Sequence, residues 1–217
     1  MTPRDRIRHW QLYVITDRRL SRGRAQQNVI RAAIAGGADA VQFRDKEASG
    51  REFFLEAQAL RDLCREAGIA FIVNDRIDVA LALGADGAHV GQEDMPARAA
   101  RELLGPERIL GVSVATPEEA IRAAADGADY LGAGPVFEAR TTKPDALSPI
   151  GAAGLRAICA VGDVPVIAIG GITADNVSEV LAAGAVGVAA ISALVFADDV
   201  EAAARRLKQA LQRPRED

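Results

Sequence analysis

Short apolar segments alternate with amphipathic, helix-like segments along the whole chain of 217 residues. The apolar segments are rich in Val, Ile and Ala, as is typical of parallel strands that are buried on both faces. The pattern predicts strands at residues 12–16, 40–44, 70–74, 87–90, 109–112, 130–133, 166–168 and 187–191. Helical segments are predicted between them, for example at 51–67, 117–125 and 176–183.

A glycine and alanine repeat punctuates this alternation. Gly36-Gly37-Ala38, Gly84-Ala85, Gly127-Ala128 and Gly184-Ala185 each end a helical segment directly before an apolar one. Glycine accepts the left-handed conformation that closes the last turn of a helix, so each copy indicates a short helix-to-strand connection. The distance between copies leaves room for about two strand-and-helix units, as expected of parallel strands joined by helical crossovers. The repeat therefore predicts an α/β fold, a single-domain (β/α)8 TIM barrel.

The length of the chain lies near the lower end of the range for such a barrel, and hydrophobic residues make up 49% of it. We expect an N-terminal extension at 1–11, the barrel at 12–211 and a C-terminal tail at 212–217. No apolar run is long enough to span a membrane, and the basic, polar N-terminus does not resemble a signal peptide. These features predict a cytoplasmic protein with no membrane partner.

Charge and cysteine content exclude other classes of protein. The net charge is −4 and no dense basic stripe occurs, which argues against a nucleic-acid partner. Cys64 and Cys159 lack CxxC spacing, so we expect buried thiols and neither a disulfide nor a zinc site.

Lysine occurs only at Lys46, Lys143 and Lys208. The first two lie where strands run into loops, whereas Lys208, in a polar C-terminal helix, is expected to be a solvated surface charge.

Polar residues follow nearly every predicted strand, and barrels build their active sites at this C-terminal face. In Gln42-Phe43-Arg44-Asp45-Lys46, strand alternation puts Gln42, Arg44 and Lys46 on one side. Two inward cations repel each other unless an anion lies between them, so the segment favours an anionic ligand. The alternative is an ion pair between one of these cations and a carboxylate such as Asp75.

Asp75 and Asp94 end adjacent predicted strands. Two carboxylates at a mouth that also carries cations indicate Mg²⁺, which combines one or two carboxylates with diphosphate oxygens and water. Acid–base chemistry, or ion pairing with Arg44 or Arg76, is the alternative role for these carboxylates.

Gly170-Gly171 and the segment 187–192 follow the last two strands, where barrels bind phosphate through backbone N–H groups. The mouth is therefore predicted to hold two anions, a diphosphate with its metal and a single phosphate.

The chain resembles the thiamine phosphate synthase family over almost its whole length. The matching segments are Leu12-Tyr13-Val14-Ile15-Thr16-Asp17, Gln42-Phe43-Arg44-Asp45-Lys46, Val73-Asn74-Asp75 and His89-Val90-Gly91-Gln92-Glu93-Asp94. The second of these matches the family's pattern Gln-x-Arg-x-Lys. The resemblance implies an enzyme that joins a pyrimidine methyl diphosphate to a thiazole phosphate, both small phosphorylated substrates. It also implies a homodimer, because relatives commonly dimerise.

The resemblance also implies a role for individual residues. It assigns the pyrimidine diphosphate to Gln42, Arg44, Lys46, Asn74, Ser113 and Lys143, the thiazole phosphate to Thr141, Thr142, Gly171, Ile191 and Ser192, and Mg²⁺ to Asp75 and Asp94. Arg44, Lys46, Ser113 and Lys143 are the expected catalytic residues. Such chemistry needs electrostatic stabilisation of the departing diphosphate and positioning of the thiazole nitrogen, with little need for a protein nucleophile. His89, in an apolar strand end, is expected to be structural.

One segment departs from the family pattern. The family has Thr-x-Thr-Lys soon after Gly-Pro-Val-Phe, and this chain is one residue longer between Phe137 and Lys143. Lys143 keeps the diphosphate role and Thr142 matches the second Thr, while Arg140 is either an additional phosphate contact or a solvent-facing side chain. Two other functions stay open: a thiazole tautomerase of the same superfamily, and a non-catalytic barrel that binds a phosphorylated regulatory ligand.

Overall fold

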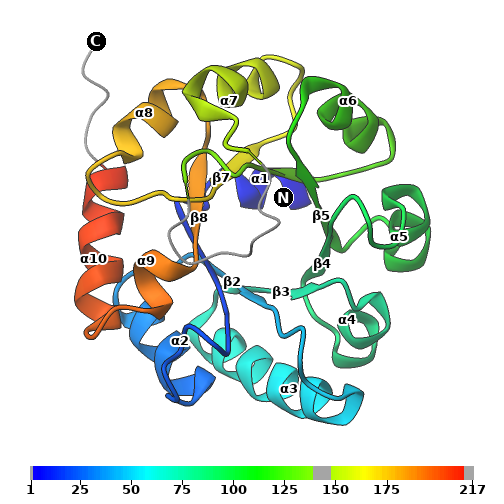
Figure 1. Cartoon of the computed structure of the whole chain (residues 1–217). Coiled ribbons are helices and arrows are strands. Elements are labelled where there is room, and N and C mark those ends of the chain that lie inside the picture. Colours follow the sequence, from blue (N-terminus) through cyan, green and yellow to red (C-terminus); the bar gives the residue numbers. More distant parts are fainter. Residues whose placement is uncertain (1, 139–147, 213–217) are drawn as a thin grey trace.

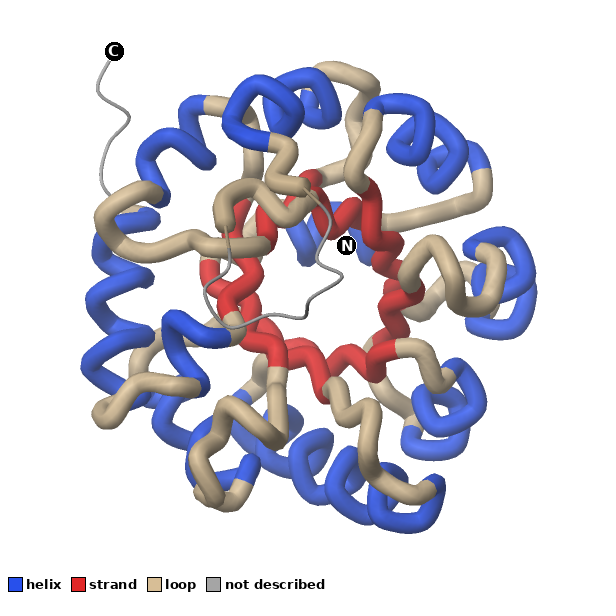
Figure 2. The backbone as a smooth tube through the Cα atoms, in the orientation of Figure 1, coloured by secondary structure: helices blue, strands red, loops and turns tan. Residues whose placement is uncertain are grey.

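The computed structural model describes residues 2–138 and 148–212, and its strands close into a parallel barrel. The strands are β1 (Leu12–Ile15), β2 (Ala40–Phe43), β3 (Ala70–Asn74), β4 (Gly87–Val90), β5 (Ile109–Val114), β6 (Tyr130–Ala133), β7 (Val166–Ile169) and β8 (Gly187–Ala190). Each strand pairs with its neighbours in chain order, and β8 pairs with β1 (Figure 2). The predicted (β/α)8 barrel is therefore confirmed.

Helices surround this ring of strands (Figure 1). The described helices are α1 (Pro3–Ile7), α2 (Gln26–Ala35), α3 (Gly50–Ala67), α4 (Ile77–Leu83), α5 (Ala97–Leu104), α6 (Pro117–Ala125), α7 (Gly151–Cys159), α8 (Val177–Ala182), α9 (Ser192–Val195) and α10 (Val200–Leu211). The glycine repeat performs the predicted task, because Gly37, Gly84, Gly127 and Gly184 all have positive φ at helix-to-strand connections. Residues other than glycine rarely adopt this backbone conformation.

Three copies of the repeat place an aspartate directly before a strand. We call Asp39, Asp86 and Asp129 the lower carboxylates, since they lie at the N-terminal end of the barrel. Each accepts a hydrogen bond from the backbone of the preceding strand: Asp39 from Leu12 at 2.8 Å, Asp86 from Phe71 at 2.9 Å and Asp129 from Leu110 at 2.9 Å. Each lower carboxylate thus ties an even-numbered strand to the odd-numbered strand before it.

Each lower carboxylate also meets a cation. Lys208 Nζ on α10 lies 2.5 Å from Asp39, and its side chain is only 16% exposed. The expectation that Lys208 is a solvated surface charge was therefore wrong. Arg6 pairs with Asp86 at 2.8 Å and Arg101 pairs with Asp129 at 2.5 Å. Carboxylates with both backbone and cationic partners strengthen the N-terminal end of the barrel.

The first residues contribute to the barrel interior. Ile7 of α1 and Trp10 are buried and belong to the same apolar cluster as the inward-facing Tyr13, Ile72 and Tyr130. In Figure 1 the short helix α1 projects within the ring of strands. The segment expected to be an extension therefore places two side chains in the barrel core, a packing that its basic, polar composition does not predict.

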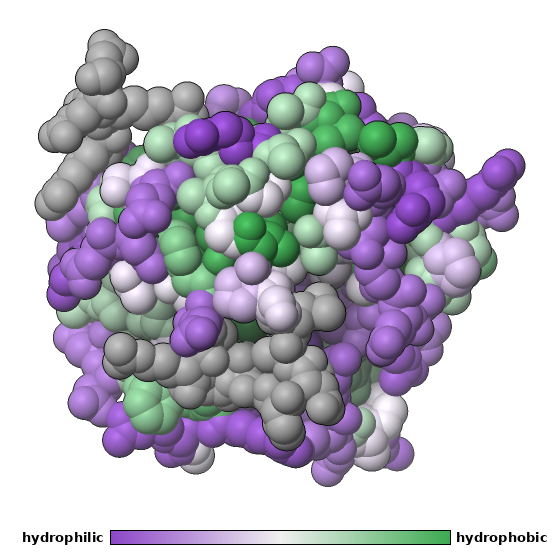
Figure 3. Space-filling view, turned by 45° about the horizontal axis from the view of Figure 1, so that its top comes forward, coloured by the Kyte–Doolittle hydropathy of each residue, from purple (hydrophilic) through white to green (hydrophobic). Residues whose placement is uncertain are grey.

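The periphery of the molecule is mainly hydrophilic in the space-filling view (Figure 3). None of the helices among residues 2–138 and 148–212 is long and apolar enough to cross a membrane. Both thiols are free; Cys64 is buried as predicted, while Cys159 is half-buried. Burial raises the pKa of the Cys64 thiol to about 12.

Candidate active site

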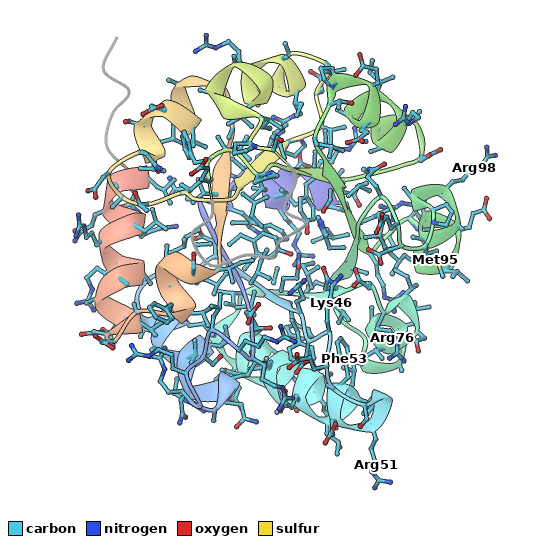
Figure 4. The ribbon with its side chains drawn as sticks, viewed as in Figure 1. Lys46, Arg51, Phe53, Arg76, Met95 and Arg98 are labelled. Carbon is cyan, nitrogen blue, oxygen red and sulfur yellow. The ribbon has the colours of Figure 1, made fainter. Side chains whose placement is uncertain are left out.

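The C-terminal ends of the strands collect the predicted site residues at one mouth. Gln42 and Asn74 lie at the ends of β2 and β3, and Ser113 lies near the end of β5. Lys46 lies close to the ring of strands in Figure 4, whereas Arg51 and Arg98 point outward from α3 and α5. The cations that follow β2 are therefore placed differently from the arginines of the outer helices.

The end of β2 follows the predicted alternation. Gln42 is 2% exposed, and Phe43 points the other way, with its ring centroid 4.6 Å from that of Phe53 on α3. The next residue is held by Thr16: the Arg44 N–H donates to the Thr16 hydroxyl at 2.9 Å, and that hydroxyl donates to the Arg44 carbonyl at 3.0 Å. These two bonds attach the segment after β2 to the end of β1.

Arg44 and Lys46 make no side-chain hydrogen bond to a carboxylate among residues 2–138 and 148–212. Arg44 Nη1 lies 3.7 Å from an Asp17 oxygen, a distance too long for a direct hydrogen bond, and Lys46 is exposed. Asp45 between them is occupied elsewhere, because its carboxylate accepts from Arg18 Nε at 2.6 Å and from the Glu47 N–H at 2.9 Å. The segment after β2 thus presents two cations toward the mouth and keeps its own carboxylate away.

Asp75 and Asp94, which we call the upper carboxylates, meet at the mouth. Asp75 has a φ of 62°, unusual for a residue with a side chain, and its N–H donates to the His89 carbonyl at 2.8 Å. Burial raises the pKa of Asp75 to about 6, with further contributions from a hydrogen bond to Asp94 and from the negative charge of Asp94. The charges of Lys46 and Arg44 oppose this rise but do not cancel it. Asp75 therefore ionises less readily than an ordinary carboxyl when no cation lies between the pair.

The upper carboxylates fit a magnesium ion. They supply hard oxygen donors, and Mg²⁺ typically takes one or two protein carboxylates and completes its shell with phosphate oxygens and water. Asp94 is oriented by the Gly91 N–H, which donates to its carboxylate at 2.8 Å. A Cβ at Gly91 would lie 2.8 Å from the same Asp94 oxygen, so the absence of a side chain at this position leaves space for the Asp94 carboxylate.

The ends of β7 and β8 lie side by side, because these strands pair in parallel. Gly170 and Gly171 follow β7 with φ values of 99° and 64°, and the Gly171 carbonyl accepts from Asn176 Nδ2 at 3.0 Å. A Cβ at Gly171 would lie 2.8 Å from the Cβ of Phe137, so the turn requires glycine there. Ile191 and Ser192 follow β8 at the start of α9. Both predicted parts of the phosphate site thus lie at adjacent strand ends.

The remaining predicted residues, Arg140, Thr141, Thr142 and Lys143, lie outside the described residues.

Known proteins match this chain over nearly its whole length. A family profile described as thiamine monophosphate synthase matches residues 12–194. The thiamine-phosphate synthase of Chloroflexus aurantiacus is 58% identical over 199 residues, covering 92% of this chain and 91% of the relative. That of Moorella thermoacetica is 55% identical, covering 95% and 98%. The chain belongs to the thiamine monophosphate synthase family.

A solved structure supports the same conclusion. Thiamine phosphate pyrophosphorylase from Pyrococcus furiosus is 45% identical and superimposes with a TM-score of 0.86, covering 95% of this chain and 98% of its own. The resemblance inferred from the Gln-x-Arg-x-Lys match and its neighbouring segments is therefore confirmed at the level of the thiamine monophosphate synthase family. The roles of individual residues stay predictions.

Sequence reasoning missed a set of polar side chains beneath the mouth. Gln42 Nε2 donates to the Tyr13 hydroxyl at 2.9 Å, and that hydroxyl lies 2.9 Å from the Tyr130 hydroxyl. The Tyr130 hydroxyl lies 2.9 Å from His89 Nδ1, and His89 Nε2 lies 2.9 Å from Ser113 Oγ. We call these five side chains the polar relay. His89 was expected to be structural and the tyrosines were not singled out, although strand alternation puts Tyr13 on the same inward side as Ile15.

Proposed function

We propose that this protein is a thiamine-phosphate synthase, a transferase that releases diphosphate, as are its near full-length relatives by name. Its substrates are 4-amino-2-methyl-5-(diphosphooxymethyl)pyrimidine and a (carboxy)thiazole phosphate. The observation that supports this most strongly is the upper carboxylate pair beside Arg44 and Lys46, because these four groups suit a diphosphate with a bound cation.

The cations after β2 act on the leaving group. As the bond between the pyrimidine methylene carbon and the diphosphate oxygen breaks, the electron pair stays with diphosphate and negative charge grows on its oxygens. Arg44 and Lys46 stabilise that charge, and we assign the same role to Lys143 from the family resemblance. The pyrimidine ring, with its amino group, shares the positive charge left on the methylene carbon.

Asp75 and Asp94 hold Mg²⁺ in this proposal, and the ion supplies neutralisation of the diphosphate charge when it is bound. Without the ion the pKa of Asp75 is raised, first by burial and then by its hydrogen bond to Asp94 and by the negative charge of Asp94. The positive charge of a bound ion would favour the ionised form of both carboxylates.

The thiazole phosphate is held at the other side of the mouth. Backbone N–H groups near Gly171 and Ser192 receive the phosphate, and Thr141 and Thr142 complete this part of the proposal. The thiazole nitrogen then donates its lone pair to the methylene carbon, which forms the new C–N bond; where the thiazole carries a carboxylate, that group leaves as CO2. The protein orients both partners and needs no covalent intermediate of its own.

The proposal is tested by mixing the purified chain with both substrates and Mg²⁺ and measuring thiamine phosphate and diphosphate in equal amounts. Conversion of the thiazole phosphate alone into an isomer would instead indicate a tautomerase. Binding of either phosphate without turnover would indicate a regulatory barrel. A homodimer is part of the proposal, and light scattering of the same preparation measures it.

A further inference from the structure

We infer that the polar relay couples the orientation of the Gln42 amide to the hydrogen-bonding role of the Ser113 hydroxyl, and thereby selects an aminopyrimidine over its oxo analogue. This inference rests on the proposed function, because it explains how the same mouth recognises its pyrimidine. It assigns Tyr13, Tyr130 and His89 as positioning residues, since they act through Gln42 and Ser113.

The relay runs through the interior of the barrel. Gln42, Tyr13, Tyr130 and His89 are 2%, 1%, 0% and 8% exposed, and only Ser113 is half-buried at the mouth. Water has little access to the four buried members, so their polar atoms depend on one another for hydrogen bonds. Each bond in the relay is 2.9 Å long, well within hydrogen-bonding distance.

The donors and acceptors of the relay follow one direction. Gln42 Nε2 donates to the Tyr13 oxygen, and in the direction that we infer the Tyr13 O–H donates to its other partner, the Tyr130 hydroxyl. The Tyr130 O–H then donates to His89 Nδ1, so the imidazole carries its proton on Nε2 and donates to Ser113 Oγ. The Ser113 O–H is left to donate to a ligand, and the Gln42 carbonyl oxygen is left to accept from one.

The direction can reverse only as a whole. If the Gln42 amide turned over, its oxygen would need a donor from Tyr13, and each hydroxyl and the imidazole would have to reverse in turn. Ser113 would then lose its role as donor toward the ligand. A partial reversal would place two donors or two acceptors against each other in the buried interior, which is costly. Gln42 and Ser113 therefore cannot adapt independently to different ligands.

The relay stays uncharged at neutral pH, so the pattern of donors and acceptors described above applies. Burial lowers the pKa of His89 to about 4, so its imidazole has one donor and one acceptor. Burial also raises the pKa of both Tyr13 and Tyr130, so neither hydroxyl is ionised.

Packing holds the aromatic members in place. A Cβ at Gly111 would lie 2.1 Å from the Tyr130 ring, and one at Gly132 would lie 3.0 Å from His89 Cε1, so glycines on neighbouring strands make room for both rings. Trp10 closes the other side, with its ring centroid 5.4 Å from Tyr13 and 5.8 Å from Tyr130. The relay is thus set in a fixed frame below the mouth.

A 4-aminopyrimidine complements the two ends of this relay. Its amino group donates to the Gln42 carbonyl oxygen, and a ring nitrogen accepts from the Ser113 O–H. An analogue with an oxo group in place of the amino group brings an acceptor against the Gln42 oxygen. Gln42 cannot turn to meet it without reversing the relay and removing the Ser113 donor. The site therefore rejects the oxo analogue through buried groups left without partners.

The tautomer of His89 provides a test that does not depend on activity. The chain has two histidines, His9 and His89, so ¹⁵N NMR of histidine-labelled protein, with His9→Gln for assignment, resolves both. We expect a neutral Nε2–H tautomer for His89 at pH 7. A His89 ring protonated on Nδ1, or one that exchanges between the two tautomers, would overturn the inferred direction.

Selectivity provides the second test. Tyr130→Phe removes the central hydroxyl, and Trp10→Phe is the matched control, since it alters the packing against Tyr130 but no relay atom. The quantity compared is the ratio of the inhibition constant of the oxo diphosphate to the KM of the amino substrate. Tyr130→Phe should lower that ratio about tenfold, roughly the effect of one buried hydrogen bond, and leave the KM of the thiazole phosphate unchanged. Trp10→Phe should keep the ratio.

An unchanged ratio in Tyr130→Phe, or equal losses in both variants, would refute the coupling. If Tyr130→Phe does not fold, Tyr13→Phe breaks the same relay one bond earlier and is measured in the same way. A wild-type chain that forms no thiamine phosphate would refute the proposed function instead, and the tautomer measurement would still decide the direction of the relay.

Discussion

The lower carboxylates and the upper carboxylates have different surroundings. At the N-terminal end, each lower carboxylate accepts backbone hydrogen bonds and pairs with a cation, as Asp129 does with the Leu110 N–H and Arg101. At the C-terminal end, Asp75 and Asp94 face each other, and the charges of Lys46 and Arg44 do not cancel the rise in the pKa of Asp75. The lower carboxylates are satisfied within the protein, whereas the upper pair keeps its negative charge available.

Under the proposed function, this difference lets one residue type serve stability at one end of the barrel and metal binding at the other. A carboxylate with backbone and cationic partners gains nothing from a ligand, because its oxygens are already used. Two carboxylates that repel each other gain from any cation that enters between them. The barrel thus separates a stabilised end from a reactive end, as this fold generally does.

The largest expected effect comes from the upper pair. Asp94→Asn replaces one of the two proposed carboxylate ligands with a neutral amide and should lower kcat/KM by about 100-fold or more, with the far-UV spectrum and unfolding midpoint retained. Lys46→Ala should act similarly by removing a cation from the leaving group. Glu93→Gln is the matched control, because Glu93 is an exposed acid beside Asp94, and it should keep the wild-type rate. Wild-type rates in Asp94→Asn or Lys46→Ala would refute the assignment of the site.

The lower carboxylates should show the opposite behaviour. Asp129→Ala leaves Arg101, 19% exposed, without its carboxylate and the Leu110 N–H without its acceptor, so it should cost about 3 kcal/mol of unfolding free energy. Its kcat at a temperature where it is folded should be unchanged. Urea unfolding measures the loss, and Glu201→Ala on α10, which breaks an exposed pair with Arg205, should cost about 0.5 kcal/mol or less. A stable but inactive Asp129→Ala would break the comparison.

The smallest effect is a difference in pH dependence between two neighbouring acids. The pKa of Asp75 is about 6 in the folded chain, above the ordinary value of 3.8, so the folded state binds more protons than the unfolded state between these values. Asp75 should therefore make the free energy of unfolding fall as pH rises from about 4 to about 6 without metal. Asp75→Asn should remove this contribution.

Asp78 on α4 gives the matched control of opposite sign. Its pKa is lowered mainly by a hydrogen bond from Arg76, so its stabilising contribution is present above the ordinary pKa and is lost as pH falls below it. Urea unfolding at several pH values compares Asp75→Asn with Asp78→Asn. Equal pH dependence in both variants would contradict the unusual environment of the upper pair.

Much of the fold could be predicted because its signals are local. Residues 70–74, 87–90 and 130–133 form strands over the predicted ranges, and the glycine repeat marks helix ends that take positive φ. The alternation after β2 also predicted correctly that Gln42 and Phe43 face opposite sides. Strand periodicity and glycine conformation are properties of neighbouring residues, so they can be inferred without knowledge of the fold.

Contacts between distant segments could not be predicted in the same way. Lys208 pairs with Asp39 across 169 positions in the sequence, and Tyr13 meets Tyr130 across 117. No local pattern distinguishes such a lysine from an exposed one. Likewise, the inward position of Tyr13 follows from alternation, but its partners depend on which strands close the ring.

The sequence by itself determined the barrel, the membership of the thiamine monophosphate synthase family and the set of polar residues at the strand ends, because periodicity, glycine spacing and local motifs carry that information. Only the tertiary structure decided which carboxylates are satisfied and which are left for a cation, and which buried groups link Gln42 to Ser113. The physical reason is that charge and hydrogen bonding depend on distances between side chains that chain closure brings together.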